Sequence, residues 1–313
     1  MSEDEYRGRD NDDRRSYGDR GRDDRKSYGD RDRGGYGDRD RGGYGDRGGR
    51  GGYDRNAPAK KVDNRFQKNR KFTNEKIVPK YLYGLNPAFE AIRSGQRNIT
   101  SAIISQGSMK NPRIIKLISI LEKNDIPFEK VEKGRLIDTC NSHDHQGVVL
   151  FCDAFKHASL DDVLLNDRIL LLNNLEDPQN VGAILRSAEI FGFKGVLLPL
   201  KGSPEIYPSI VKVSAGATEY LDVNRSAGVT SYLSRAKDEG YTIISLDGRG
   251  ESTFADLKEK ELGKILLVIG GEDKGVGQFV LTSSDYIASI KQAGRVNSLN
   301  ASVAAGIAMS SLV

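Results

Sequence analysis

The second half of the chain alternates continuous apolar segments with helical segments. The apolar segments, which are strand candidates, are 168–174, 195–200, 241–247, 264–271 and 286–290. The helical segments are 181–191, 207–215, 228–239 and 299–312. Strands that are apolar throughout and alternate with helices are typical of a mostly parallel sheet covered on both faces. We therefore predict an α/β domain with a parallel sheet over 168–313.

A smaller α/β pattern precedes this domain. The predicted helices are 86–95, 111–126 and 135–140, and the predicted strands are 99–105, 127–132 and 145–153. This alternation over a short stretch favours a small sandwich of helices and sheet. We predict a first domain over 80–154, joined to the second by a linker at 155–167.

Residues 1–79 have a different composition. Residues 1–55 repeat Arg, Gly, Asp and Tyr, as in "RGGYGDRDRGGYGDRGGRGGY", and lack Leu, Ile, Val and Phe, so we predict a disordered tail. Arg, Gly and Tyr suit single-stranded RNA through phosphate contacts and stacking, although a solubilising polyampholyte has the same composition. The segment 55–80 is more basic and carries Phe66 and Phe72. It is typical of a linker that faces either nucleic acid or solvent.

The rest of the composition limits the kinds of site. The two cysteines, Cys140 and Cys152, are too few for a disulfide framework or a cysteine zinc cluster. His143 and His145 have no further ligands beside them, so we expect no metal centre. No apolar run is long enough to span a membrane, and the N-terminus has no apolar leader segment. We expect a cytoplasmic protein, with a mitochondrial location as the alternative.

Three polar motifs follow strand ends in the second domain. The first, "NNLEDPQNVGAILRSAEIFG", carries Asn180 and Arg186. The second, "VIGGEDKGV", has glycines that free backbone groups to meet a ligand, and it matches neither a P-loop nor a dinucleotide-binding fingerprint. The third, "GRVNSLNASVAAG", opens the last helix. Each alone also fits a capped helix or a tight turn. Because ligands bind beyond the carboxyl ends of strands in such sheets, the three together predict a binding site.

The joint occurrence of these motifs resembles the SpoU/TrmH family of RNA ribose 2′-O-methyltransferases, within the SPOUT superfamily. The matching positions are Asp177-Pro178-x-Asn180-x-Gly182 with Arg186, Gly270-x-Glu272-x-x-Gly275, and Ser298-Leu299-Asn300. The first domain opens "YGLNPAFEAI", closes "HQGVV", and resembles the L30e-like substrate-binding domain of members that modify rRNA. The resemblance implies a second domain with a trefoil knot near its C-terminus, an exception to the usual unknotted topology.

The resemblance also implies the chemistry, which is methyl transfer from S-adenosyl-L-methionine held largely by backbone groups. The positions implied to bind this cofactor are Gly270, Gly271, Gly275, Ile290 and Leu299. The positions implied to be catalytic are Asn180, Arg186, Glu272, Ser298 and Asn300. No His or Cys occurs in the motifs, so the usual general bases are absent. The resemblance implies that Arg186 takes the role of base. A milder role for Arg186 is to bind the RNA phosphate and polarise the hydroxyl.

The expected substrate is a guanosine ribose in 23S-type large-subunit rRNA, and the expected assembly is a homodimer. The alternatives are a tRNA ribose 2′-O-methyltransferase and a non-catalytic RNA-binding or ribosome-assembly protein with the same fold. The intact set of polar motif residues favours an enzyme, because a pure binder does not need them. The sequence departs from the family at Lys291 and Gln292, where proline and methionine are usual beside the cofactor loop.

Overall fold

The computed structural model describes residues 78–271, 275–296 and 298–313. The predicted tail, nearly all of the basic linker, and Glu272 lie outside the described residues.

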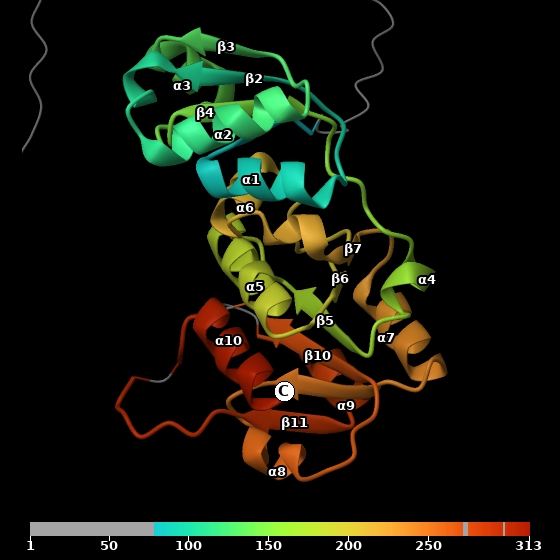
Figure 1. The fold of residues 1–313 in the computed structure, drawn as a ribbon. Helices are drawn as coiled ribbons and strands as arrows, with labels where there is room; N and C mark the ends of the chain where they lie inside the picture. The colour runs from blue at the N-terminus through green and yellow to red at the C-terminus, as the bar shows by residue number, and fades with distance from the viewer. Residues whose placement is uncertain (1–77, 272–274, 297) are drawn as a thin grey trace, which may run out of the picture. The chain divides into compact units, whose positions relative to one another are not determined.

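The first domain is a four-stranded sheet between two layers of helices (Figure 1). Its strands are β1 (Tyr81–Tyr83), β2 (Ile99–Ser105), β3 (Phe128–Val131) and β4 (Val148–Cys152), in the order β1-β4-β2-β3. Its helices are α1 (Leu85–Ser94), α2 (Pro112–Lys123) and α3 (Lys133–Cys140). One face of the sheet, with Ile104 and Leu150, packs on α1 and α2. The other face, with Ile103 and Val149, packs on Leu136 of α3. Alternate residues of each strand therefore serve separate cores.

The second domain is built on a parallel sheet, as predicted. The strands are β5 (Arg168–Asn173), β6 (Gly195–Leu197), β7 (Asp222–Asn224), β8 (Thr242–Leu246), β9 (Ser252–Thr253), β10 (Ile265–Gly270) and β11 (Tyr286–Ser289). Their order in the described sheet is β7-β6-β5-β10-β8-β11-β9, and every pairing is parallel. The central strands β5 and β10 are buried on both faces because helices cover each side.

Two sets of helices provide this cover. One face packs on α5 (Pro178–Ile190), α6 (Pro208–Val213), α8 (Phe254–Lys258) and α10 (Ala301–Ser311). The other face packs on α4 (Leu160–Val163), α7 (Val229–Asp238) and α9 (Gln278–Ser283). Among the described residues, no helix has the length and apolar character needed to cross a membrane.

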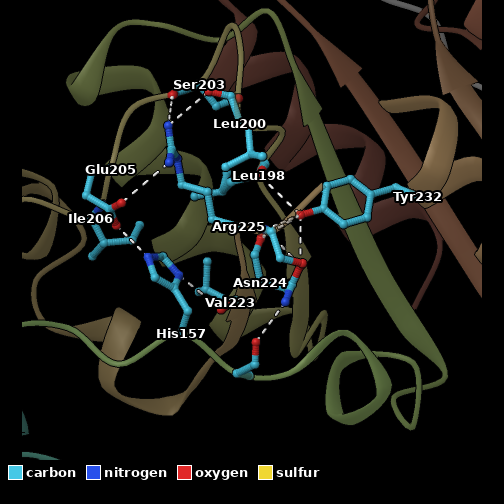
Figure 2. A network of polar contacts seen from close by, with 12 residues as sticks. His157, Leu198, Leu200, Ser203, Glu205, Ile206, Val223, Asn224, Arg225 and Tyr232 are labelled. Atoms are coloured by element: carbon cyan, nitrogen blue, oxygen red, sulfur yellow. Dashed lines mark hydrogen bonds and ion pairs between the residues drawn. The ribbon is translucent and has the colours of Figure 1, made fainter. Parts of the chain in front are cut away.

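The segment 155–167, predicted as a plain linker, contains α4 and is held to the second domain by polar contacts (Figure 2). His157 Nε2 lies 2.5 Å from Glu205 Oε1, and His157 Nδ1 lies 3.2 Å from the carbonyl oxygen of Val223. Both ring nitrogens of His157 therefore lie within hydrogen-bond distance of an oxygen of the second domain. The hydrogen bond from His157 is the largest cause of the lowered pKa of Glu205, whose other oxygen lies 3.5 Å from Arg225 Nη1.

A buried ion pair joins the two domains. Arg97 precedes β2, and Glu219 lies in a 3₁₀ turn at Ala217–Tyr220. Arg97 donates from Nε and Nη2 to the carboxylate of Glu219, with a shortest distance of 2.8 Å. The side chains are only 6% and 1% exposed. Such a pair is costly to break, because the remaining charge is left buried without its counter-charge.

We expect Glu219→Gln to lower the free energy of unfolding by about 3–5 kcal/mol, because Arg97 loses its only buried counter-charge in the described structure. Urea denaturation followed by circular dichroism measures the change. The matched control is Glu129→Gln, which breaks the exposed Arg135–Glu129 pair and should change stability by less than about 0.5 kcal/mol. Equal effects of the two substitutions would show that the Arg97–Glu219 pair does not hold the domains together.

Candidate active site

Two of the predicted motifs meet where β5 and β10 end. The two strands pair in parallel so that Asn173 lies opposite Gly270. The Gly271 N–H donates to the Asn173 carbonyl over 3.0 Å, and the buried Asn173 side chain donates to the Val276 carbonyl over 2.6 Å. These bonds fasten the loop after β10 to the end of β5.

The glycines of this loop are required by close backbone contacts. A Cβ on Gly270 would lie 2.4 Å from the carbonyl carbon of Gly275, and one on Gly271 would lie 2.0 Å from the carbonyl oxygen of Asn174. Gly275 has a φ of +57° and donates from its N–H to the Gly271 carbonyl over 2.9 Å. No side chain fits at either of the first two positions, so the loops pack backbone against backbone.

The first motif forms the start of α5. Asp177 caps the helix by accepting from the Gln179 N–H over 2.9 Å, and Pro178 is the first helical residue. The helix was predicted to begin at residue 181 with Asn180 before it, which is wrong: Asn180 lies in the first turn, because the cap is Asp177. Gly182 allows α6 to approach, since a Cβ there would lie 2.6 Å from Cβ of Val213.

Arg186 lies further along α5 and is exposed. No described residue forms a hydrogen bond or ion pair with its guanidinium. The guanidinium is therefore exposed where an anionic ligand can reach it.

The third motif meets the first through a pair of amide side chains. Asn300 is the N-cap of α10, where its Oδ1 accepts from the backbone N–H of Ser302 over 2.9 Å and of Val303 over 3.3 Å. Its Nδ2 donates to Asn180 Oδ1 over 2.9 Å. Figure 1 shows α10 beside α5, and the two helices pack together. Asn300 thus caps its helix and contacts the first motif with the same amide group.

The segment between β11 and α10 is exposed. Ile290 is half-buried against the core, whereas residues 291–296 are exposed and their backbone groups bond to no other described residue. Ser298 and Leu299 are also exposed. Among the described residues, these contacts join only some of the residues predicted for the site, and Arg186, Ser298 and Leu299 have no protein partner. The predicted residues that the contacts join are Asn180, Gly270, Gly271, Gly275 and Asn300.

Two residues of this region were not singled out in the sequence. Asn173 is only 6% exposed and carries the bond to Val276, and Asn174 has a φ of +56° beside Gly271. The sequence feature that could have identified them is the Asn-Asn pair directly after an apolar strand. A buried amide needs hydrogen-bond partners, and asparagine tolerates a positive φ.

No described group of three or more His, Cys, Asp or Glu side chains is arranged to bind a metal ion. The arrangement instead offers backbone groups and amides at a strand-end edge, with the exposed guanidinium of Arg186 on α5. Such groups bind a polar ligand and align it.

We expect Asn300→Ala to lower the free energy of unfolding by about 1 kcal/mol, because the N-cap of α10 is lost. Asn300→Asp keeps the capping oxygens and loses the donor to Asn180, so its stability should stay close to that of the unaltered chain. Chemical denaturation measures both. An Asp variant as unstable as the Ala variant would mean that the contact with Asn180, and not the cap, is the main source of stability.

Comparison with known proteins agrees with this geometry. The model of the SpoU rRNA methylase family matches residues 167–310, which include all three motifs. The model of the RNA 2′-O ribose methyltransferase substrate-binding domain matches residues 81–158, which include the first domain.

Curated relatives cover both domains. A protein of Mycobacterium ulcerans, named an uncharacterized tRNA/rRNA methyltransferase, is 32% identical over 235 residues, covering 73% of this chain and 75% of the relative. A Staphylococcus saprophyticus protein, named as a tRNA/rRNA methyltransferase of the TrmH family, is 32% identical over 243 residues, covering 75% of this chain and 94% of the relative.

Solved structures share the fold. The SpoU methyltransferase AviRb of Streptomyces viridochromogenes, in complex with AdoMet, has a TM-score of 0.61 at 22% identity and covers 74% of this chain and 88% of its own. An AdoMet-bound rRNA methyltransferase of Sinorhizobium meliloti has a TM-score of 0.61 at 19% identity, covering 74% and 85%. With its motifs, domain matches and relatives taken together, the chain belongs to the SpoU family of RNA methyltransferases.

Proposed function

We propose that this protein methylates a ribose 2′-hydroxyl of large-subunit rRNA, with a guanosine as the target, using S-adenosyl-L-methionine. The observation that carries the proposal is the bond between Asn300 and Asn180, which brings the first and third motifs to one place. Two relatives named as tRNA/rRNA methyltransferases and the rRNA methylase family model support the reaction class. AviRb, a solved structure similar in fold, binds AdoMet.

The residues present fit the proposed cofactor. Exposed backbone groups of residues 291–296 lack partners in the described structure, and the tightly packed Gly270–Gly271 corner keeps side chains out of the strand end. The end of β10 at Gly270, together with Ile290 and Leu299, would hold the cofactor by backbone contacts. When bound, S-adenosylmethionine supplies an activated methyl group on a sulfonium sulfur.

The protein's part in the reaction is alignment and proton handling. The protein would hold the ribose 2′-hydroxyl facing the cofactor's methyl group, and the hydroxyl proton would pass to water at this exposed site. Arg186 has an exposed guanidinium that bonds to no described residue, and it would bind the phosphate beside the ribose and polarise the hydroxyl. The stronger role, in which Arg186 takes the proton, stays a hypothesis, because arginine is almost always protonated. Asn180 and Asn300 would orient the reacting groups, and Ser298 and Glu272 are the further polar residues that the motifs assign to the site.

We also propose a homodimer. The helices α5 and α10, which pack together, carry the exposed apolar side chains of Ile190, Val303 and Ile307. Apolar side chains in water on neighbouring helices favour burial against another protein surface. A second copy of the chain, joined along these helices, would bury them.

The substrate is tested by methyl transfer from labelled S-adenosylmethionine to purified large-subunit rRNA and to bulk tRNA. We expect label in rRNA at one ribose, mapped by resistance of the adjacent bond to alkaline cleavage, because a separate substrate-binding domain precedes the catalytic one. Label in tRNA would support the proposed methyl transfer and show that tRNA, not rRNA, is the substrate. No label in either RNA, with no cofactor binding, would favour a non-catalytic RNA-binding protein.

We expect Arg186→Ala to lower the rate of methyl transfer by about 10²–10³-fold, the loss typical when one group that stabilises developing charge is removed. Folding and cofactor affinity should be retained, because no described residue bonds to Arg186. Single-turnover assays measure the rate, and isothermal titration measures cofactor affinity. The matched control is Arg235→Ala on α7, whose exposed ion pair with Asp161 lies outside the site. A near-normal rate for Arg186→Ala would overturn the assigned role.

A further inference from the structure

The loop that follows β6 touches the junction of the β5 and β10 ends directly. We call residues 198–207, which lie between β6 and α6, the β6 loop. The buried Ser203 donates from Oγ to a backbone carbonyl of β5 over 3.0 Å. Gly202 lies against Asn174, since a Cβ there would lie 2.9 Å from Asn174 Oδ1. Asn174 in turn packs against Gly271, so the β6 loop and the loop after β10 contact the same residue.

Charged side chains hold the β6 loop from its other side (Figure 2). Arg225, directly after β7, donates from Nη2 to the carbonyl oxygens of Leu200 and Ser203 over 3.1 and 3.3 Å. Glu205, within the loop, has one carboxylate oxygen 3.5 Å from Arg225 Nη1. Its other oxygen lies 2.5 Å from His157 Nε2. His157 is the partner that comes from the linker between the domains.

The linker presents His157 in a defined place. The Ala158 N–H donates to the Val223 carbonyl over 2.9 Å, and Asn224 Nδ2 donates to the Ala158 carbonyl over 2.8 Å. These bonds fasten the linker along β7, the strand at one end of the described sheet. The His157 ring stands edge-on to the Phe155 ring, with the centroids 5.2 Å apart. The backbone bonds therefore carry the linker, and the His157 ring is left to contact the β6 loop.

The same part of the linker also contacts the first domain. The Arg97 guanidinium lies over the Phe155 ring, 5.3 Å from its centroid, and donates to the Asp153 carbonyl over 3.2 Å. Arg97 is the residue that forms the buried pair with Glu219. A row of contacts therefore runs from Arg97 through Phe155 and His157 to the β6 loop.

The contact between His157 and Glu205 has a cost when it is lost. The two side chains are only 25% and 23% exposed. The pKa of Glu205 lies below its usual range, chiefly because of the hydrogen bond from His157, so the carboxylate is charged. A half-buried carboxylate that loses such a partner is stabilised by moving toward water. That movement would draw the β6 loop away from Asn174.

We propose that His157 is a positioning residue for the methyl transfer. Its contact with Glu205 holds the β6 loop against Asn174, and Asn174 keeps the Gly271 corner and the start of α5 in place. In this role His157 acts through Glu205 and touches neither the ribose nor the cofactor. The inference rests on the proposed function for its kinetic measurement.

The kinetic test is steady-state methyl transfer by the full chain. His157→Phe keeps a ring beside Phe155 and removes both nitrogens, while the backbone bonds of Ala158 keep the linker attached. We expect kcat to fall about 10–10²-fold, because a small misplacement of aligned groups is costly. The KM values for RNA and for S-adenosylmethionine should be unchanged, since no residue assigned to bind them is altered. His157→Gln, which restores a donor toward Glu205, should recover most of kcat.

Two further variants keep the test specific. Asp161→Asn is the matched control, because it breaks the exposed pair of the same linker with Arg235 and should retain kcat. Glu205→Gln closes a double-mutant cycle with His157→Phe. If His157 acts through Glu205, the double variant is no slower than Glu205→Gln alone. Losses that multiply would show that the two residues act separately, and would overturn the proposal.

Amide hydrogen exchange followed by NMR tests the positioning without any activity. The Gly271 N–H donates to the Asn173 carbonyl, and in His157→Phe we expect it to exchange about three- to tenfold faster. The amides of β2 in the first domain should keep their rates. Faster exchange at both places would mean a general loss of stability and would overturn the proposal, as would an unchanged rate at Gly271.

The proposed function fails separately. If the unaltered chain transfers no methyl group to any RNA, the enzyme assignment is lost, and the exchange rate of the Gly271 N–H still decides whether His157 positions the strand-end junction. If the unaltered chain methylates RNA and His157→Phe does so with the same kcat, the enzyme stands and the positioning role is wrong.

Discussion

The candidate site depends on one close contact, the backbone of Gly271 against the backbone of Asn174. A Cβ at residue 271 would lie 2.0 Å from the Asn174 carbonyl oxygen, so the loops after β5 and β10 touch without any side chain between them. The buried amide of Asn173 fastens the same junction to Val276. With these loops fixed, α5 begins in a defined place and presents Asn180 to Asn300. A backbone junction of this kind resists local motion, because interiors packed at such density do not deform gradually.

The two domains have different roles in the proposed reaction. The second domain supplies rigid strand ends and few titratable groups, which suits a transfer that needs alignment more than strong acids or bases. The first domain supplies a hollow of about 690 Å³ whose lining includes Arg113 and Lys133. The buried Arg97–Glu219 pair joins the two domains.

Much of the fold followed from apolar patterning, because long buried strands leave a strong signal. β2 was predicted residue for residue, and β5 to within one residue. β7 was missed, since three residues are too few to show a period, and α4 was missed inside the expected linker. The strand predicted at 145–153 is wrong over its first three residues, where positive φ at Gln146 and Gly147 makes a turn. The glycines of the site, Asn180 and Asn300 were identified by motif, whereas Asn173 and Asn174 were not singled out. The hydrogen bond between Asn180 and Asn300 could not be predicted from the local sequence, because it depends on how α10 packs on α5.

The contacts of the candidate site join residues that are far apart in the sequence, and this affects how fast they form during folding. Asn173 and Val276 are 103 residues apart, and Asn180 and Asn300 are 120 apart. Contacts that close such long loops are slow to form, because the chain entropy is lost before the contact stabilises anything. A partly folded molecule with a complete first domain and strands β5 to β7 would have neither contact. Such an intermediate would already have a complete first domain and still lack the strand-end junction, so the candidate active site would be among the last parts of the molecule to form.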